Sequence, residues 1–345
     1  MSMVSLPWGG SISFFAFCVT LGALVACVWT VYRAHKFGAG DGGAIFFSAL
    51  SGALGLLLGR AVFCAVRFDD LFYDPMGDFL GLSPFLDLNQ GSLNVIGAIL
   101  GVLLAALLVG AVCGKSSLAL LDSAAVPGLA LFAWVRLVEP LGGTGFGDTL
   151  TNEAFCRVPF AIENSWGTHL LSVCFIEAVL AALIALALLI AGRFCRKKGT
   201  LGGIALALLC VSQIMPDSLR HDDALFLFTF ARVSQMGYGV LLLGVLVGGL
   251  IRGGKRGLGA ITIILETILL LLGVGVLVGA EFALDKTNWP DEAVYAGMIV
   301  TLLCVGFLVV RRLVKEDRVP RFAPAPEADP EDEETEETDG GKAEA

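Results

Sequence analysis

LLDSAAVPGLALFAWVRLVEPLGGTGFGD, residues 120 to 148, joins an apolar run to a charged pair and a glycine-rich segment. A helix needs about 20 apolar residues to cross a bilayer, so the run predicts a membrane span over 118–137. Arg136 and Glu139 are three residues apart, which places them on one face of a helix. The glycines that follow let the backbone leave the helix and approach a ligand or a neighbouring helix closely. The stretch therefore predicts a span that ends in a charged, irregular segment.

Apolar runs of similar length recur along the whole chain. The 345 residues are 56% hydrophobic and only 16% charged, which is typical of an all-α polytopic membrane protein. Turn residues and charges divide the runs into nine predicted spans. Besides 118–137, these are 11–32, 44–66, 93–113, 169–192, 201–216, 227–251, 258–280 and 293–310.

Charge in the connecting segments predicts the orientation. Five segments on alternate turns of the chain carry 14 Lys and Arg residues, namely YRAHKFG, GKSS, RFCRKKG, RGGKRG and RRLVKEDR. Basic loops face the cytoplasm in most membrane proteins. The other loops hold only four cations, Arg67, Arg157, Arg220 and Lys286, and are predicted to face outward. An odd number of spans then places the N-terminus outside and the C-terminus in the cytoplasm.

The formal charge of −9 mostly describes the C-terminal tail. Ten of the 32 acidic residues fall in the last 19 positions. Such a segment cannot bury enough apolar area to offset the entropy of ordering, so 321–345 is predicted to be a disordered cytoplasmic appendage.

The composition favours neither a metal nor a nucleotide site. The nine cysteines are scattered singly without a CxxC pair, and the chain has three histidines, so no metal and no cofactor is expected. The segment GGTGFG lacks the Lys-Ser/Thr of a P-loop and follows no predicted strand. Nucleic acid is not an expected partner.

Among the ionisable residues within or at the edges of the spans, we consider Arg60, Arg136, Glu177, Arg232 and Glu266. A charge at the bilayer centre costs roughly 2.5 to 3.5 kcal/mol, so each needs a partner, a cavity or the headgroup region. The first four are predicted to lie at one depth in the outer half. They suit either a pocket for a lipid phosphate or a set of structural ion pairs such as Arg136 with Glu139. Glu266 has no obvious partner and is interpreted as a local hydrogen-bonding acid.

The order of segments from about residue 8 to 250 resembles the bacterial prolipoprotein diacylglyceryl transferase family, which are seven-span enzymes. LLLGRAVFCAVRFDD at 56–70 is similar to the family's Gly-Arg-x-x-Tyr stretch and keeps Arg60. NQGSLNVIGAILG at 89–101 resembles its Phe-His-Gly-Gly block and keeps Gly91, Gly97 and Gly101.

Residues 120–148 resemble the family's Gly-Arg-Ile-Gly-Asn-Phe signature. This stretch keeps Asp122, Arg136, Gly143, Phe146 as an aromatic residue, and Gly147. Further along, Glu177 matches the glutamate that closes a His-Pro-Ser-Gln-Leu-Tyr-Glu motif. Three later positions also match: Asp217 and Arg220 in a Glu-Phe-Phe-Arg motif, and Gln235 in Met-Gly-Gln.

The chain departs from the family at four positions that the family uses for catalysis or headgroup binding. The family's histidine is Ile96 here, a tyrosine of the first span is Phe17, the asparagine of the signature is Glu139, and an arginine before Asp217 is Gln213. Spans eight and nine have no counterpart in the seven-span core. The predicted domains are therefore a core at 1–256, a two-helix extension at 257–320 and the tail at 321–345.

The resemblance implies transfer of a diacylglyceryl group from phosphatidylglycerol to a lipobox cysteine thiol in the bacterial plasma membrane. Phosphatidylglycerol or a related anionic phospholipid, and a prolipoprotein signal peptide, are the implied partners. Arg136 would hold the phosphate with Arg60 and Arg220, while Gly143 and Gly147 would let the loop close over the headgroup. Glu177 and Gln235 complete the predicted binding residues.

The base that takes the thiol proton is less obvious, because Ile96 cannot accept one. Glu139 is the leading candidate, and His169 and His221 are weaker ones. Two other function classes stay open. One is a non-catalytic phospholipid-binding or accessory paralogue, and the other is a transporter, for which no internal repeat is visible.

Overall fold

The computed structural model describes residues 3–5, 11–73, 76, 78–86, 93–151, 155–163, 166–221, 225–227, 231–254, 260–286 and 289–318. Within these ranges nine helices are long and apolar enough to cross a membrane. They are α1 (Phe14–Phe37), α2 (Asp41–Val66), α5 (Val95–Cys113), α6 (Ser117–Val138), α7 (Val173–Ala191), α8 (Thr200–Ser218), α9 (Val233–Gly254), α10 (Ala260–Lys286) and α11 (Asp291–Arg318).

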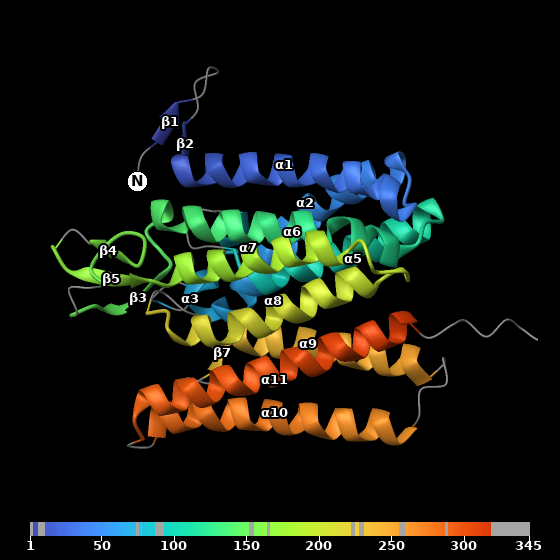
Figure 1. The fold of residues 1–345 in the computed structure, drawn as a ribbon. Coiled ribbons are helices and arrows are strands. Elements are labelled where there is room, and N and C mark those ends of the chain that lie inside the picture. Colours follow the sequence, from blue (N-terminus) through green and yellow to red (C-terminus); the bar gives the residue numbers. More distant parts are fainter. Residues whose placement is uncertain are drawn as a thin grey trace, which may run out of the picture.

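These helices lie side by side in one bundle, and the short elements gather at one end of it, on the left in Figure 1. The short helices are α3 (Phe68–Phe72), α4 (Ser83–Leu86) and the 3-10 helix η1 (Glu139–Gly142). The strands are β1 (Met3–Ser5), β2 (Ser11–Ser13), β3 (Phe146–Thr149), β4 (Ala161–Glu163), β5 (His169–Ser172), β6 (Phe226–Leu227) and β7 (Ala231–Arg232). We call the end with β3, β4 and β5 the sheet end and the opposite end the basic end.

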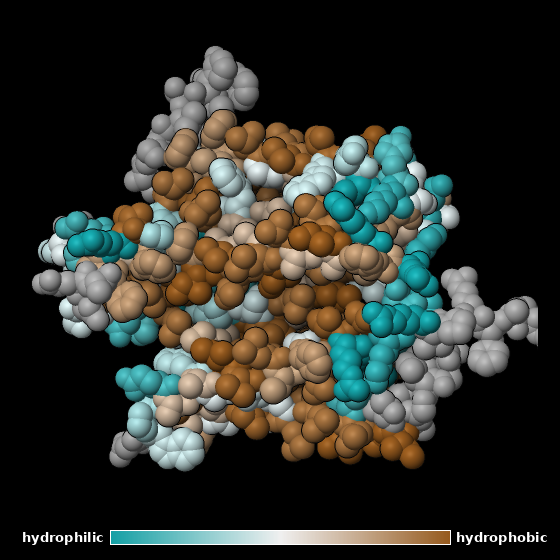
Figure 2. All heavy atoms as spheres, in the orientation of Figure 1, coloured by the Kyte–Doolittle hydropathy of each residue, from teal (hydrophilic) through white to brown (hydrophobic). Residues whose placement is uncertain are grey.

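Apolar side chains cover the middle of the bundle, as a bilayer requires. Figure 2 shows a broad hydrophobic band over the helices and hydrophilic residues concentrated at the basic end, on the right. A helix satisfies its own backbone hydrogen bonds, which is why apolar runs of this length form helices in lipid. The chain is thus an all-α polytopic membrane protein, as predicted, with short strands outside the spans.

The helix ends differ from the prediction where caps and strand pairing decide them. The first span begins at Phe14, because Ser11–Ser13 pairs with β1 and Ser13 Oγ accepts the Ala16 N–H at 3.2 Å. It continues to Phe37, so most of the predicted YRAHKFG loop is helical. Gly38 ends it with φ 67°, a conformation that glycine adopts without strain. Likewise, 169–172 is strand β5 rather than the start of a span.

Glycines bring α2 and α5 into close contact. A Cβ on Gly97 would overlap the Leu58 backbone, and one on Gly101 would lie 2.5 Å from Gly55 N. Small residues at such interfaces let membrane helices approach closely. Asn94 fixes the start of α5, because its side chain accepts the Ile96 N–H at 2.9 Å. Two of the three glycines in the predicted family block therefore serve helix packing, and Gly91 lies outside the described residues.

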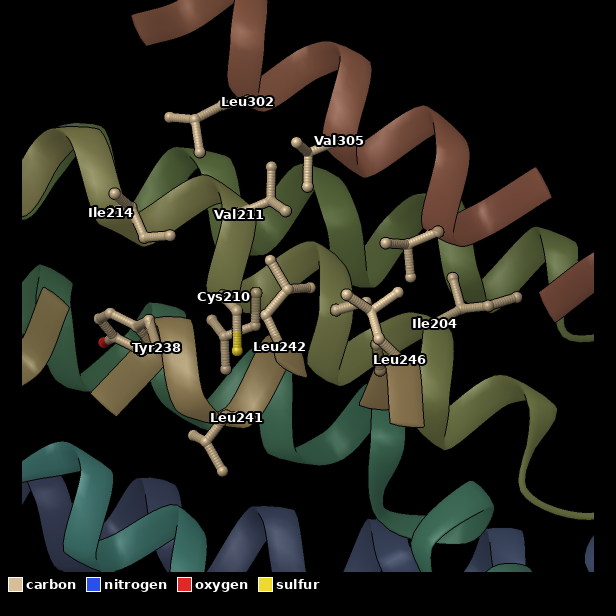
Figure 3. Packing of buried hydrophobic residues seen from close by; sticks show 14 of the residues in the cluster. Ile204, Cys210, Val211, Ile214, Tyr238, Leu241, Leu242, Leu246, Leu302 and Val305 are labelled. Carbon is tan, nitrogen blue, oxygen red and sulfur yellow. The ribbon is translucent and has the colours of Figure 1, made fainter. Parts of the chain in front are cut away.

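The largest buried cluster is shared by α8, α9 and α11. Figure 3 shows Leu302 and Val305 of α11 beside Val211 and Ile214 of α8, with Leu242 of α9 below them. Helix α11 also packs against α10 and α9. The predicted two-helix extension therefore shares one core with the helices before it.

Polar groups tie α11 to the first turn of α8 at the basic end. Asp317 accepts the N–H groups of Arg196 at 3.0 Å and Lys197 at 2.7 Å, and the Thr200 hydroxyl at 3.1 Å. Asp122 of α6 accepts the Gly199 and Gly202 N–H groups. The free N–H groups at a helix start favour carboxylates, so Asp122 caps α8, while Asp317 binds the segment just before the helix.

Glu266 was interpreted as a local hydrogen-bonding acid, and this interpretation is wrong. Its Oε2 lies 3.4 Å from Arg312 Nη1, and its Oε1 lies 3.9 Å from Lys315 Nζ. Arg312 also pairs with Glu316 one turn along α11 at 3.5 Å. Arg312 could not be identified as the partner of Glu266 from sequence spacing, because the two residues meet only when α10 packs on α11.

Candidate functional site

The charged pair of the opening stretch lies where α6 ends at the sheet end. Arg136 is in the last turn of α6, and Glu139 begins η1, with Pro140 at an early position that suits a helix start. Gly143 and Gly145 follow with φ 79° and 93°, which permit the tight turn into β3. The chain therefore leaves the membrane span immediately after the two charges.

A three-stranded antiparallel sheet carries the chain from this turn to α7. Its order is β3-β5-β4, and β5 runs directly into α7. The Cys174 N–H donates to the Gly145 carbonyl at 3.0 Å, which joins the start of α7 to the glycine turn. This brings Glu177, in the first turns of α7, beside the end of α6.

Four charged side chains, from α6, η1, α7 and the segment after α8, form one cluster in which every carboxylate contacts both arginines. Arg136 Nη1 lies 2.8 Å from Glu139 Oε2, and Arg136 Nε lies 3.0 Å from Glu177 Oε2. Arg220, just beyond the end of α8, donates from Nη1 to Glu177 Oε2 at 3.1 Å and from Nη2 to Glu139 Oε1. Cations and anions alternate, so the cluster has no net charge.

The cluster is shielded from solvent. The Glu177 side chain is 1% exposed, and those of Arg136, Arg220 and Glu139 are 10 to 12% exposed. Buried charges persist only when they are paired and hydrogen-bonded, because desolvation costs several kcal/mol per ion. The sequence predicted the pair Arg136–Glu139 from its spacing, and the structure adds Glu177 and Arg220 to it.

Strand β7 and the start of α9 hold the end of α8 and the Arg220 backbone in place. Arg232 donates to the Arg220 carbonyl at 2.6 Å and to the Asp217 carbonyl. Ser234 Oγ lies 2.5 Å from Asp217 Oδ2, and Gln235 Nε2 lies 2.8 Å from Ser218 Oγ. Asp217, Arg232 and Gln235 therefore bind the end of α8 to α9, and Arg220 projects from the segment they fix.

Arg60 binds a different part of the sheet end. Its Nη2 donates to the Pro84 carbonyl at 2.6 Å and its Nε to the Phe85 carbonyl at 3.2 Å. The guanidinium also lies over the Phe63 ring, 5.2 Å from its centroid. These contacts fix α4 against α2, and the assignment of Arg60 to phosphate binding stays a prediction.

The replaced family positions are mostly apolar or buried. Ile96 is buried against α9, where a Cβ on Gly237 would overlap its side chain. Phe17 faces outward from α1 and is 42% exposed. Gln213 is fully buried, and among the described residues its Oε1 has no hydrogen-bond partner.

Tyr238 on α9 is a residue that sequence reasoning missed. It is completely buried, and its hydroxyl has no partner within the described part of the chain. It lies within electrostatic range of Arg136 and Glu177. A hydroxyl inside an apolar span was the available signal, because buried tyrosines usually place the hydroxyl against a polar group.

A groove of about 490 Å³ opens beside the cluster on the sheet end. The Thr144 hydroxyl lies 3.4 Å from Glu139 Oε1 and so connects the groove to the buried charges. Gly143 and Gly147, both predicted site residues, lie on its wall. A Cβ on Gly147 would lie 2.6 Å from the Leu219 carbonyl oxygen, so only glycine fits there. The lining is Gly143, Thr144, Phe146, Gly147, Asp148, Thr149, Leu170 and His221.

Comparison with models of known protein families gives a match to most of the chain. The model of the prolipoprotein diacylglyceryl transferase family matches residues 3–251, from β1 into the last turn of α9. No curated protein matches the chain. The matched region contains the whole charged cluster and the groove, and it ends before α10. The chain therefore belongs to the prolipoprotein diacylglyceryl transferase family.

Proposed function

We propose that this protein transfers the diacylglyceryl group of phosphatidylglycerol to the thiol of a lipobox cysteine, at the outer leaflet of a bacterial plasma membrane. The observation that carries the proposal is the convergence of Arg136 and Arg220 at one buried point beside the groove. Guanidinium groups bind phosphate through parallel hydrogen bonds and stabilise the charge that a leaving phosphate develops. Both arginines occupy positions matched to motifs of the family.

In the proposed reaction the thiolate sulfur attacks the glycerol carbon that carries the phosphate ester. A carbon–sulfur bond forms and the carbon–oxygen bond breaks, and its electron pair leaves with the phosphate oxygen. Glycerol phosphate departs while the diacylglyceryl group stays on sulfur. Arg136 and Arg220 would hold the phosphate throughout, which lowers the barrier by stabilising the leaving group.

Glu139 must release an arginine before phosphate can bind in this way. Both of its oxygens contact guanidinium groups, Oε2 that of Arg136 and Oε1 that of Arg220. A lipid phosphate would compete with this internal carboxylate for the same donors. Glu139 is therefore poorly placed to serve as the thiol base while the cluster is closed.

A second candidate function is a phospholipid-binding accessory protein without catalysis. Two observations favour it: the closed, neutral cluster, and the apolar Ile96 where the family has a histidine. The two functions share the lipid site and differ only in whether a thiol is modified.

Complementation of a strain depleted of its own diacylglyceryl transferase separates the two functions. The transferase proposal expects restored growth, and a diacylglyceryl adduct on the N-terminal cysteine of a reporter lipoprotein by mass spectrometry. Growth arrest without an adduct, at verified membrane expression, would overturn it. If native mass spectrometry of the same protein then finds bound phosphatidylglycerol, the accessory function takes its place.

A further inference from the structure

His221 lines the groove immediately after Arg220 of the cluster. Its backbone N–H donates to the Phe146 carbonyl at 2.9 Å, which fixes it against the edge of β3. Residue 221 is exposed. The groove therefore presents an imidazole next to the residue that would hold the leaving phosphate.

The hydrogen bond of the His221 ring determines which of its two nitrogens carries the proton. His221 Nδ1 lies 3.3 Å from the Leu219 carbonyl oxygen. A carbonyl oxygen can only accept, so Nδ1 carries the proton in this contact. In a neutral imidazole the other nitrogen, Nε2, then has the lone pair and can accept a proton.

Neither Glu139 nor the residue at the family's histidine position offers a free proton acceptor in the closed cluster. Both oxygens of Glu139 contact arginines, and Ile96 has no basic atom. Thr144 connects the groove to the cluster through its contact with Glu139. A nucleophile in this groove would therefore share one wall with His221 and with Thr144, which contacts Glu139 of the cluster.

We propose that this groove binds the acceptor cysteine and that Nε2 of His221 takes its thiol proton; this inference rests on the proposed function. The S–H proton moves to Nε2 and leaves a thiolate and an imidazolium. The thiolate forms the bond to the glycerol carbon as glycerol phosphate leaves, and the imidazolium then returns its proton to water. General bases of this kind contribute about 10²- to 10⁴-fold to a rate.

A pair of acceptor peptides tests the assignment in the full-length protein reconstituted with phosphatidylglycerol. One lipobox peptide carries cysteine and the other carries selenocysteine, whose selenol is already ionised at neutral pH and needs no base. His221→Asn retains a side-chain N–H that can donate to Leu219 and removes the basic nitrogen. His35→Asn, at the basic end, is the matched control.

With the cysteine peptide, His221→Asn should lower turnover by about 100-fold or more, whereas His35→Asn should stay within about twofold. With the selenocysteine peptide, His221→Asn should lower turnover by less than about tenfold. Equal losses with both peptides would identify a positioning role and overturn the base assignment. The assignment would also be overturned if His221→Asn modified the cysteine peptide as fast as the wild-type protein does. If the wild-type protein modifies neither peptide, the proposed function itself fails.

Discussion

Two buried ion clusters lie inside this bundle, and their surroundings differ. Arg136, Glu139, Glu177 and Arg220 meet where helices end, beside positive-φ glycines and a groove. Glu266, Arg312 and Glu316 meet along the regular helices α10 and α11. Paired charges can hold helices together anywhere in a membrane protein. Irregular backbone and an open groove beside them are what distinguish a candidate site from a structural pair.

The strongest test of this distinction is truncation of one arginine in each cluster. Arg136→Ala should lower diacylglyceryl transfer by at least about 10³-fold, because it removes a phosphate donor and leaves Glu139 and Glu177 underpaired. Mass spectrometry of a reporter lipoprotein measures the loss. Arg312→Ala should destabilise the protein by about 3 to 5 kcal/mol, since Glu266 and Glu316 lose their ion pairs with Arg312.

The comparison depends on turnover per folded molecule, measured beside thermal unfolding in detergent. Arg312→Ala should keep wild-type turnover in its folded fraction. If Arg312→Ala loses turnover as Arg136→Ala does while remaining folded, the two clusters do not differ in function and the distinction fails.

A smaller effect is expected from Glu139→Asn, which places the family's residue in the signature. The variant removes one of the two carboxylates that contact Arg136 and Arg220, so less negative charge competes with an anion for these arginines. We expect affinity for phosphatidylglycerol to rise about tenfold, which corresponds to about 1.4 kcal/mol. Titration of the purified protein with phosphatidylglycerol nanodiscs measures it, with the isosteric Glu139→Gln as the matched variant. Unchanged or weaker lipid binding in both variants would show that Glu139 does not compete with phosphate.

The smallest effect concerns the groove wall. Gly147→Ala would place a Cβ 2.6 Å from the Leu219 carbonyl oxygen and 2.8 Å from Val173, so the segment that carries His221 must shift. Overpacking of this kind costs about 1 to 3 kcal/mol, and we expect turnover to fall severalfold. Gly128→Ala, in α6 with open space around the new methyl group, is the control and should keep wild-type turnover. Equal turnover of the two variants would argue against a functional groove.

The fold class could be predicted from the sequence because its signal is local. An apolar run of about 20 residues must form a helix in lipid, and nine such runs correspond to nine helices among the described residues. Helix ends were less predictable. Phe14 and Gly38 bound α1 because of a strand pairing and a left-handed cap, and neither changes the hydropathy of the run.

In the candidate site, too, local contacts could be predicted from the sequence and contacts between distant segments could not. The pair Arg136–Glu139 followed from i,i+3 spacing, which places the two side chains on one face and allows their 2.8 Å contact. Only the packing of α7 and α8 against α6 decided that Glu177 and Arg220 would close the cluster. The contact of Arg60 with α4 likewise could not be read from spacing, because Arg60 and Pro84 are 24 residues apart in the sequence.

The sequence by itself therefore determined a polytopic bundle, the family and one charged pair, because apolar length, motif order and helix periodicity are properties of consecutive residues. The tertiary structure alone decided that the charges neutralise one another, that α11 shares the core of α8 and α9, and that His221 lines the groove. Each of these depends on which side chains from distant segments come within contact distance. Helix periodicity describes positions within one helix, so it does not specify these contacts between distant segments.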